Sequence, residues 1–241
     1  MTSTIAAQRL TLALPSKGRL MDDSLATLGR AGFQITKSQS ARGYRGTVAG
    51  RPEIDVRFVS ASEIAQLLRQ GDVHLGVTGE DLMREVAGEA ETRVDFAAKL
   101  GFGHANVVVA VPACWLDVRR LADLEPMAMR FRRVHGHRVR VATKYLHLTR
   151  LHFARAGITS YRIVESFGAT EGTPGAGLAE MIVDITSTGA TIKANGLKVL
   201  EDGVLLASEA HLIRSKTAKW TPALAGLARE LVRAVGAGGT S

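Results

Sequence analysis

The sequence contains little cysteine, few aromatic residues and no long apolar run. Cys114 is the only cysteine among the 241 residues, so neither a disulfide nor a thiolate zinc site can form within one chain. The first nine residues include no apolar signal-peptide core, and no later stretch is long and apolar enough to span a membrane. We therefore expect a globular protein that works in a reducing cytoplasm and has no membrane partner.

Several common catalytic motifs are also missing. The sequence has no Walker A motif, no complete GxGxxG, no HExxH and no GxSxG. Its seven histidines are scattered, and no two of them have neighbouring carboxylates at a useful helical spacing. These absences leave no candidate for nucleophilic catalysis.

Positive charge, in contrast, is in excess. The formal net charge is +8, which favours anionic partners but does not choose between nucleic acid, phosphorylated metabolites and an acidic subunit. Part of the excess lies in a basic stretch at residues 130–140, which includes five arginines and two histidines. We expect this stretch to be the polar end of a helix that runs into a strand. A nucleic-acid-binding patch is the alternative, although no known binding motif accompanies it.

Short apolar segments alternate with helical patterns along most of the chain. Strands are predicted at residues 10–14, 54–59, 73–77, 106–111, 139–142, 161–164 and 181–185, followed by two strands joined by a hairpin turn at Asp202-Gly203. Helices are predicted at residues 19–31, 60–70, 118–134, 144–156 and 222–235. Ser60 and Glu63 form a capping-box pattern at the start of the second helix. The alternation predicts an α/β fold, with a parallel or mixed sheet covered by helices on both faces.

The chain is long enough for two such α/β lobes. We expect it to cross from the first lobe to the second near residues 98–103. If the final hairpin and helix return to the first lobe, lobe I comprises residues 1–98 and 195–241, and lobe II comprises residues 99–194. A cleft would then lie between the two lobes.

The stretch after the apolar strand at residues 181–183 has the features of a phosphate-binding loop. It consists of Asp184, Ile185, Thr186, Ser187, Thr188, Gly189, Ala190 and Thr191. Free backbone N–H groups at the start of the next helix favour an anion, and Thr188 and Thr191 add hydroxyl donors. Gly189 lets a phosphate approach the backbone, while Asp184 suits sugar hydroxyls or a hydrated magnesium ion. A serine and threonine helix cap without a ligand is the alternative.

A second strand-to-helix turn, at residues 15–19, places Lys17 and Arg19 on either side of Gly18. It follows the carboxyl end of a strand, where α/β proteins bind their ligands, and its two cations suit a pyrophosphate or polyphosphate group. A solvated helix start is the alternative, but cations are unfavourable beside a helix N-terminus, and this favours a functional role. Thr143 and Lys144 repeat the pattern more weakly.

Four segments, residues 12–20, 76–81, 142–149 and 183–197, resemble signatures of the ATP phosphoribosyltransferases and occur in the family's order. The resemblance implies two periplasmic-binding-protein-like (type II) lobes, the second inserted into the first, and, for the short form of the family, no C-terminal regulatory domain. It also implies an enzyme that transfers the phosphoribosyl group of phosphoribosyl pyrophosphate to N1 of ATP. Such an enzyme uses magnesium, releases pyrophosphate and opens histidine biosynthesis.

The resemblance also implies roles for the residues singled out above. The loop at residues 184–191 would hold the 5-phosphate and ribose, and Glu171 would contact the ribose hydroxyls. Lys17 and Arg19 would be catalytic, facing the pyrophosphate and the ATP phosphates. The implied contacts to ATP or pyrophosphate are Lys17, Gly18, Arg19, Thr143 and Lys144. Magnesium would be carried by the substrate without a direct protein ligand, and Asp184 would reach it through water.

Partners are implied in the same way. The short form works with a regulatory subunit similar to histidyl-tRNA synthetase, and we expect a homodimer of the catalytic chain and no nucleic acid.

The sequence departs from the family at Ser60, where many short-form members carry an arginine, and at residues 172–177, which are unusually rich in glycine. The alternative function is that of a solute-binding protein with the same two-lobed fold.

Overall fold

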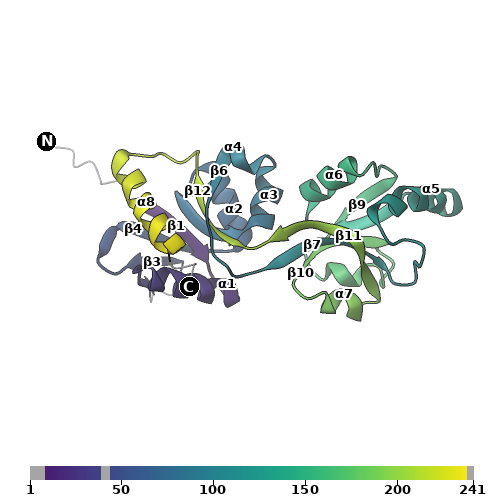
Figure 1. Cartoon of the computed structure of the whole chain (residues 1–241), viewed down its shortest axis with the longest axis horizontal. Coiled ribbons are helices and arrows are strands. Elements are labelled where there is room, and N and C mark those ends of the chain that lie inside the picture. The colour runs from purple at the N-terminus through teal and green to yellow at the C-terminus, as the bar shows by residue number, and fades with distance from the viewer. Residues whose placement is uncertain (1–8, 39–43, 238–241) are drawn as a thin grey trace. The chain divides into compact units, whose positions relative to one another are not determined.

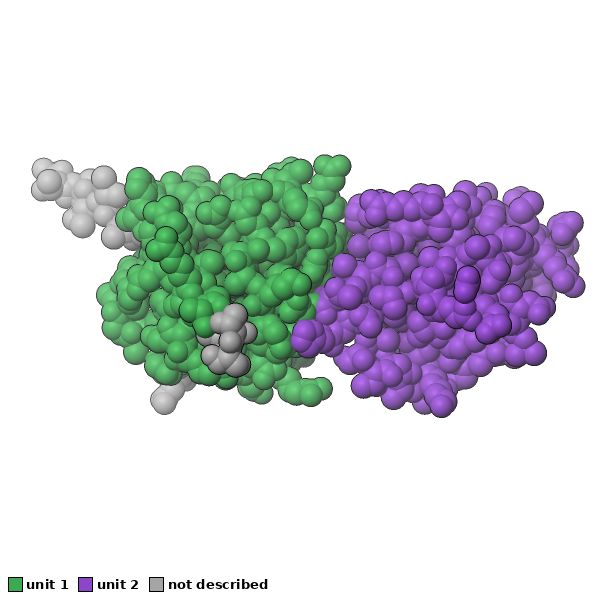
Figure 2. Space-filling model, viewed as in Figure 1, with its two compact units in different colours: residues 1–103, 209–241 green, residues 104–208 purple. Residues whose placement is uncertain are grey.

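The computed structural model describes residues 9–38 and 44–237, which form two compact α/β units. Unit 1 contains Met1–Gly103 and Glu209–Ser241, and unit 2 contains His104–Ser208 (Figure 2). The second unit is therefore inserted into the first, the arrangement that the family resemblance implies. None of the helices within the described ranges combines the length and apolar character that a membrane crossing requires.

The observed boundaries differ from the predicted ones at both crossings. Residues 99–103 belong to unit 1 and residues 195–208 to unit 2. The second difference arises because β11 (Leu197–Ser208) pairs antiparallel with β7 (Ala105–Pro112) of unit 2. The predicted hairpin at Asp202-Gly203 is wrong, since β11 continues through these two residues with an irregular register. A Cβ on Gly203 would lie 2.8 Å from the Leu200 Cβ, so this glycine allows close packing within the strand and makes no hairpin turn.

The sheet of unit 1 has the strand order β2-β3-β4-β1-β5-β12-β6. Its strands are β1 (Leu10–Pro15), β2 (Ile35–Lys37), β3 (Arg45–Val48), β4 (Arg51–Val59), β5 (Leu75–Gly79), β6 (Val94–Lys99) and β12 (Ala210–Ser215). Strands β1, β4 and β5 are parallel, so their carboxyl ends meet at one edge of the sheet. Strand β12, which the chain forms after it returns from unit 2, is antiparallel to β5 and β6.

Helices cover both faces of this sheet (Figure 1). They are α1 (Gly18–Arg30), α2 (Ala61–Gln70), α3 (Glu80–Ala87), α4 (Ala90–Arg93) and α8 (Pro222–Ala237). Because side chains alternate along a strand, Leu12 packs on one face with Leu28 of α1 and Leu231 of α8. Ala13 packs on the other face with Ile64 of α2. The apolar run of β1 is therefore buried on both sides.

Unit 2 has a five-stranded sheet of order β11-β7-β10-β8-β9. The strands not yet named are β8 (Val139–Thr143), β9 (Tyr161–Glu165) and β10 (Met181–Thr186), and these three are parallel. The helical segments are η1 (Leu121–Asp123), α5 (Leu124–His135), α6 (Leu146–Arg155), η2 (Thr170–Gly172) and α7 (Ala190–Ala194). Ile182 of β10 and Ile192 of α7 are buried in one apolar cluster, which fixes the start of α7 against the sheet.

Candidate functional site

The carboxyl ends of β8, β9 and β10 form one edge of unit 2. Thr143 is opposite both Val183 and Glu165 in the sheet register, so the residues that follow these strands emerge side by side. They include Lys144 after β8 and Asp184 near the end of β10. The edge of a parallel sheet is where α/β folds bind ligands. The sheet thus brings Thr143, Lys144 and the loop at residues 184–191 to one place.

Asp184 interacts with two other predicted site residues at this edge. Its Oδ1 accepts a hydrogen bond from the N–H of Ile185 at 2.8 Å. Burial raises the pKa of Asp184, and the negative charge of Glu171 adds to the rise, while the Ile185 N–H and the Lys144 ammonium oppose it. Because the pKa is raised overall, the Ile185 N–H and the Lys144 ammonium do not fully offset the cost of burying the Asp184 carboxylate. Added cationic or hydroxyl groups of a ligand would relieve that cost.

The loop after Asp184 is shaped by its own hydroxyl groups. Thr186 Oγ1 accepts a hydrogen bond from the N–H of Gly189 at 2.8 Å, and Ser187 Oγ donates to the carbonyl of His104 at 3.2 Å. Gly189 has φ +74°, a conformation that strongly favours glycine. Thr191 is exposed, and neither its hydroxyl nor its N–H forms a hydrogen bond within the described chain. Thr186 and Ser187 therefore hold the loop, while Thr191 is free to contact a ligand.

Not every predicted contact offers a free polar group. Thr143 is buried, and its Oγ1 already accepts a hydrogen bond from the N–H of Tyr145 at 2.8 Å. Lys144 beside it is exposed, and its Nζ lies 5.1 Å from the centroid of the Tyr145 ring. Thr143 thus shapes the turn, and Lys144 supplies the positive charge. Thr188, also exposed, accepts a 3.3 Å hydrogen bond from the N–H of Ala190.

The loop that carries Glu171 is fixed at both ends. At its start, Thr170 Oγ1 donates to Ser166 Oγ at 3.0 Å, and Ala169 has φ +48°. Ala169 is the only non-glycine residue with positive φ in the described ranges, and such strain often accompanies functional sites. At its far end, Arg140 donates to the carbonyl of Gly177 at 3.0 Å.

Arg140 is the last residue of the basic stretch, and the rest of that stretch lies at the end of α5. This helix ends at His135, Gly136 follows with φ +74°, and β8 begins at Val139. The expected helix end running into a strand is confirmed. Phe131 packs against His135 at this helix end, with ring centroids 4.1 Å apart.

The turn at residues 15–19 lies at the carboxyl edge of the unit 1 sheet. The N–H of Ser16 donates to the carbonyl of Val59 at 2.9 Å, which joins the ends of β1 and β4. Lys17 occupies the N-cap of α1 in an extended conformation, no side chain caps the helix, and its first turn holds no acidic residue. Lys17 and Arg19 are exposed and have no ion-pair partner among the described residues. This arrangement leaves N–H groups and two cations directed to solvent.

Sequence patterns missed a third cation beside this turn. Lys37, the last residue of β2, donates from Nζ to the carbonyl of Ser16 at 3.2 Å. Its proximity follows from the sheet order, which a local pattern does not contain. Ser60, also at this edge, accepts a hydrogen bond from the N–H of Glu63 at 3.2 Å, which confirms the predicted cap of α2. The Ser60 hydroxyl is therefore committed to the helix.

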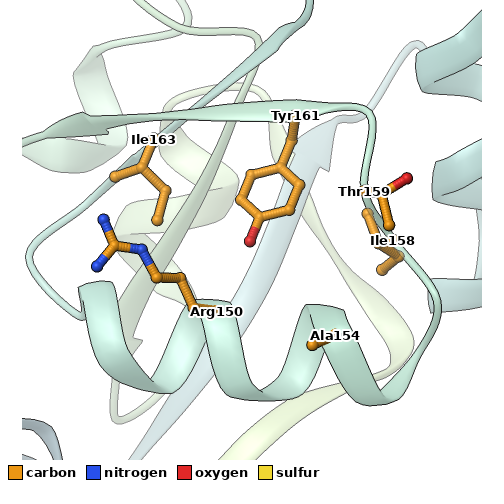
Figure 3. A pocket seen from close by; sticks show the side chains of 6 residues that line it. All are labelled: Arg150, Ala154, Ile158, Thr159, Tyr161 and Ile163. Atoms are coloured by element: carbon orange, nitrogen blue, oxygen red, sulfur yellow. The ribbon is translucent and has the colours of Figure 1, made fainter.

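A hollow of about 460 Å³ lies elsewhere on unit 2, between α6 and β9. Figure 3 shows Arg150 of α6 and Tyr161 of β9 extending into the space between the two elements. Its remaining lining residues are Ala154, Ile158, Thr159 and Ile163. None of the predicted site residues lines it, and Thr159 precedes the amino end of β9, away from the carboxyl edge. We therefore base the candidate site on the sheet edge and the turns beside it.

Comparison with known proteins relates the chain to one family. The chain matches the family described as HisG: ATP phosphoribosyltransferase over residues 60–235. It is 56% identical over 224 residues to the ATP phosphoribosyltransferase of Afipia carboxidovorans. The aligned part is 93% of this chain and 68% of that protein, so the chain spans about two thirds of its relative's length.

Solved structures with a similar fold include both an enzyme and a solute-binding protein. The first is the ATP phosphoribosyl transferase (HisG:HisZ) complex from Thermotoga maritima, with a TM-score of 0.69, 24% identity, and coverage of 94% of this chain and 98% of that one. The second is the arginine-, lysine-, histidine-binding protein ArtJ from Geobacillus stearothermophilus, with a TM-score of 0.54, 13% identity, and coverage of 95% and 88%. These likenesses show the fold alone and confirm the predicted periplasmic-binding-protein-like α/β class. The family match distinguishes between the enzyme and the solute-binding protein, because the matched family is the ATP phosphoribosyltransferases.

Proposed function

The chain belongs to the ATP phosphoribosyltransferase family, and we propose that residues 184–191 of unit 2 bind the 5-phosphate and ribose of phosphoribosyl pyrophosphate. As a member, it is a phosphoribosyltransferase of the glycosyltransferase class. It transfers the phosphoribosyl group to N1 of ATP in the first step of histidine biosynthesis. The alternative of a solute-binding protein is set aside, because the likeness to such proteins is one of fold only.

One observation carries the assignment of the loop. At a single sheet edge, Asp184 interacts with Lys144 and Glu171, and a glycine-containing loop with an unpartnered threonine follows directly. Thr191 and the N–H groups before α7 suit the phosphate, since exposed donors at a helix start favour anions. Glu171 and Asp184 suit the ribose hydroxyls, which donate hydrogen bonds to carboxylates.

The turn of unit 1 would stabilise the departing pyrophosphate. In the reaction, N1 of adenine forms a bond to the anomeric carbon while the bond from that carbon to pyrophosphate breaks, and negative charge grows on the leaving group. Lys17 and Arg19 supply two cations that no protein carboxylate within the described ranges neutralises. Such preorganised charge stabilises a transition state more than a ground state. Because positioning of the substrates and charge stabilisation are enough for this transfer, the reaction needs no nucleophile from the protein.

Magnesium fits the donors at the unit 2 edge only as an ion shared with the substrate. Burial raises the pKa of Asp184 and the charge of Glu171 adds to the rise, so a divalent cation near the two carboxylates would offset both effects. Phosphate oxygens and water would supply the magnesium ligands, so neither carboxylate would need to bind it directly. When bound, magnesium would neutralise charge on the pyrophosphate group. Asp184 would orient one of its water ligands and thereby position the substrate.

We also propose a cytoplasmic location, a homodimer and a separate regulatory subunit. The exposed free Cys114 suits a reducing compartment. A solved structure of the same fold is a HisG:HisZ complex, which supports a second, HisZ-like subunit, and the family resemblance implies that this subunit is similar to histidyl-tRNA synthetase. Titration of histidine into the isolated chain tests the regulatory proposal. Histidine should not bind or inhibit; tight binding away from the substrates, with inhibition, would place the sensor in this chain.

The central test mixes the protein with ATP, phosphoribosyl pyrophosphate and magnesium, and measures pyrophosphate release. Arg19→Ala should lower turnover more than it raises either Michaelis constant, because Arg19 stabilises charge that grows in the transition state. Normal turnover with only a raised Michaelis constant would reassign Arg19 to ground-state binding. Lys219→Ala, an exposed lysine of unit 1 whose carbonyl contacts His74 just before β5, is the control and should behave as wild type.

A further inference from the structure

We propose that Lys37 is a third polyphosphate-binding cation of the unit 1 turn, acting beside Lys17 and Arg19. The inference rests on the proposed function of that turn and extends it to a residue on a different strand. Its ligand is a linear polyphosphate, supplied either by the phosphates of ATP or by pyrophosphate.

The position of Lys37 follows from the order of the sheet. Strand β2 lies two positions from β4, with β3 between them, and β4 lies beside β1. Each neighbouring pair among β2, β3 and β4 is antiparallel, so β2 ends at the same edge as β4 and β1. Lys37, at the end of β2, reaches along this edge, and its Nζ lies 3.2 Å from the carbonyl oxygen of Ser16. Ser16 is the residue directly before Lys17.

The ammonium group is held from two sides. Its Nζ lies 4.7 Å from the centroid of the Phe58 ring and 3.4 Å from Sδ of Met21. Gly46 is opposite Lys37 in the register of β2 and β3, and a Cβ on Gly46 would lie 2.9 Å from the Phe58 ring. The glycine therefore makes room for the aromatic ring that supports the lysine. Lys37 is thus directed to the Ser16 carbonyl by its surroundings.

This anchoring leaves binding capacity unused. An ammonium group has three donors; one is given to the Ser16 carbonyl and one to the weak acceptor Sδ of Met21, so one is left for a ligand. Lys37 is exposed and forms no ion pair with any carboxylate in the described ranges. Ser16, the residue that Lys37 contacts, precedes the other two cations of the turn, Lys17 and Arg19.

The surroundings of the turn explain why an anion is needed. Three cations lie around the start of α1, where the partial positive charge of the helix makes them unfavourable neighbours. The end of β4 adds no carboxylate: it includes the half-buried Arg57, and the neutral Ser60 that follows caps α2 with its hydroxyl. A multiply charged phosphate chain offsets this repulsion through charge-assisted hydrogen bonds. Single carboxylate or monophosphate groups would reach fewer of the three cations at once.

The experiment titrates the full-length protein with inorganic tripolyphosphate, in the absence of magnesium, by calorimetry. Lys37→Met should weaken binding by about tenfold, the effect of losing one charge-assisted hydrogen bond, and Lys37→Arg should stay within about threefold of wild type. Lys219→Met removes an exposed charge of unit 1 near the opposite, amino end of β5 and should leave the affinity unchanged. In the enzyme assay, Lys37→Met should raise the Michaelis constant for ATP more than it lowers turnover.

The outcomes separate this inference from the function on which it rests. If Arg19→Ala weakens tripolyphosphate binding and Lys37→Met does not, Lys37 only covers Phe58 and the inference is wrong. If neither variant weakens binding, the turn does not bind polyphosphate, and both proposals fail together. Thermal unfolding of each variant shows whether it is folded, and Lys37→Gln gives the same comparison if the methionine variant does not fold.

Discussion

Arg140 and Glu180 form an ion pair in unit 2, with 2.6 Å between Nη2 and Oε1. The backbone N–H of Arg140 also donates to Oε2 of Glu180 at 2.6 Å, and the same Nη2 donates to the carbonyl of Gly177. Burial by itself would raise the pKa of Glu180, but the hydrogen bonds from Arg140 outweigh it and lower the pKa. The last arginine of the basic stretch therefore anchors the loop that contains Glu171.

Arg140→Met should loosen this loop. We expect the free energy of unfolding to fall by about 1–3 kcal/mol, because the half-buried Glu180 loses its partner. The Michaelis constant for phosphoribosyl pyrophosphate should rise about threefold to tenfold with little change in that for ATP, since Glu171 is no longer positioned. Urea unfolding and steady-state kinetics measure the two effects.

Arg138→Met is the matched control, because Arg138 belongs to the same basic stretch and its side chain has no partner among the described residues. It should leave stability and both Michaelis constants at wild-type values. Equal effects of the two variants would instead assign the kinetic change to the overall charge of the stretch.

Asp184→Asn should stabilise the free protein and impair the enzyme. Burial raises the pKa of Asp184 in the folded state, so its ionised form opposes folding at neutral pH, and that cost disappears as the pH falls through the raised pKa. The variant should gain about 0.5–1 kcal/mol at pH 7, as functional sites often trade stability for activity. Its affinity for phosphoribosyl pyrophosphate with magnesium should fall roughly tenfold. Higher stability with unchanged affinity would remove Asp184 from the site.

Local sequence patterns predicted those features that depend on neighbouring residues. The Ser60–Glu63 cap is one, since both partners lie within one helical turn. The loop after β10 is another, because a buried strand followed by hydroxyl residues and Gly189 is itself the structural unit. The insertion of one lobe into the other followed from the family resemblance, which covers the return to unit 1.

Features that depend on distant partners were missed or misplaced. Asp202-Gly203 has the composition of a hairpin turn, but β11 pairs with β7 on both sides of these residues, with a register shift between Val199 and Val204, and the strand continues. Lys37 gave no local signal, because its contact with Ser16 depends on the order of four strands. The structural role of Arg140 was hidden within a run of arginines, and only the position of Glu180 distinguishes it.

Thr186 and Thr191 should respond differently to the same substitution. Thr186→Val removes the acceptor for the Gly189 N–H, so we expect a loss of about 0.5–1.5 kcal/mol of stability along with weaker binding. Thr191→Val changes an exposed side chain without a partner in the described chain, so stability should be unchanged. Binding of phosphoribosyl pyrophosphate should nevertheless weaken by about 1–3 kcal/mol. Unchanged affinity in folded Thr191→Val would defeat the assignment of this residue.

Glu125 should make the free energy of unfolding depend on pH in the acidic range. Burial by itself would raise its pKa, but hydrogen bonds from the side chains and backbone N–H groups of Ser160 and Thr159 outweigh it and lower the pKa from 4.5 to about 2. Because the folded pKa is the lower one, the ionised carboxylate stabilises the fold above pH 4.5, and this contribution is lost as the pH falls toward 2. Glu125→Gln should therefore cost about 1–3 kcal/mol at pH 7.

The pH series distinguishes this charge effect from a simple loss of packing. The difference in unfolding free energy between wild type and Glu125→Gln should shrink steadily between pH 5 and pH 2, about the interval between the two pKa values. Glu63→Gln is the control, since its exposed side chain contributes only to the first turn of α2. A difference for Glu125→Gln that stays constant from pH 7 to pH 2 would mean that the shape of the side chain, and not its ionisation, joins α5 to the start of β9.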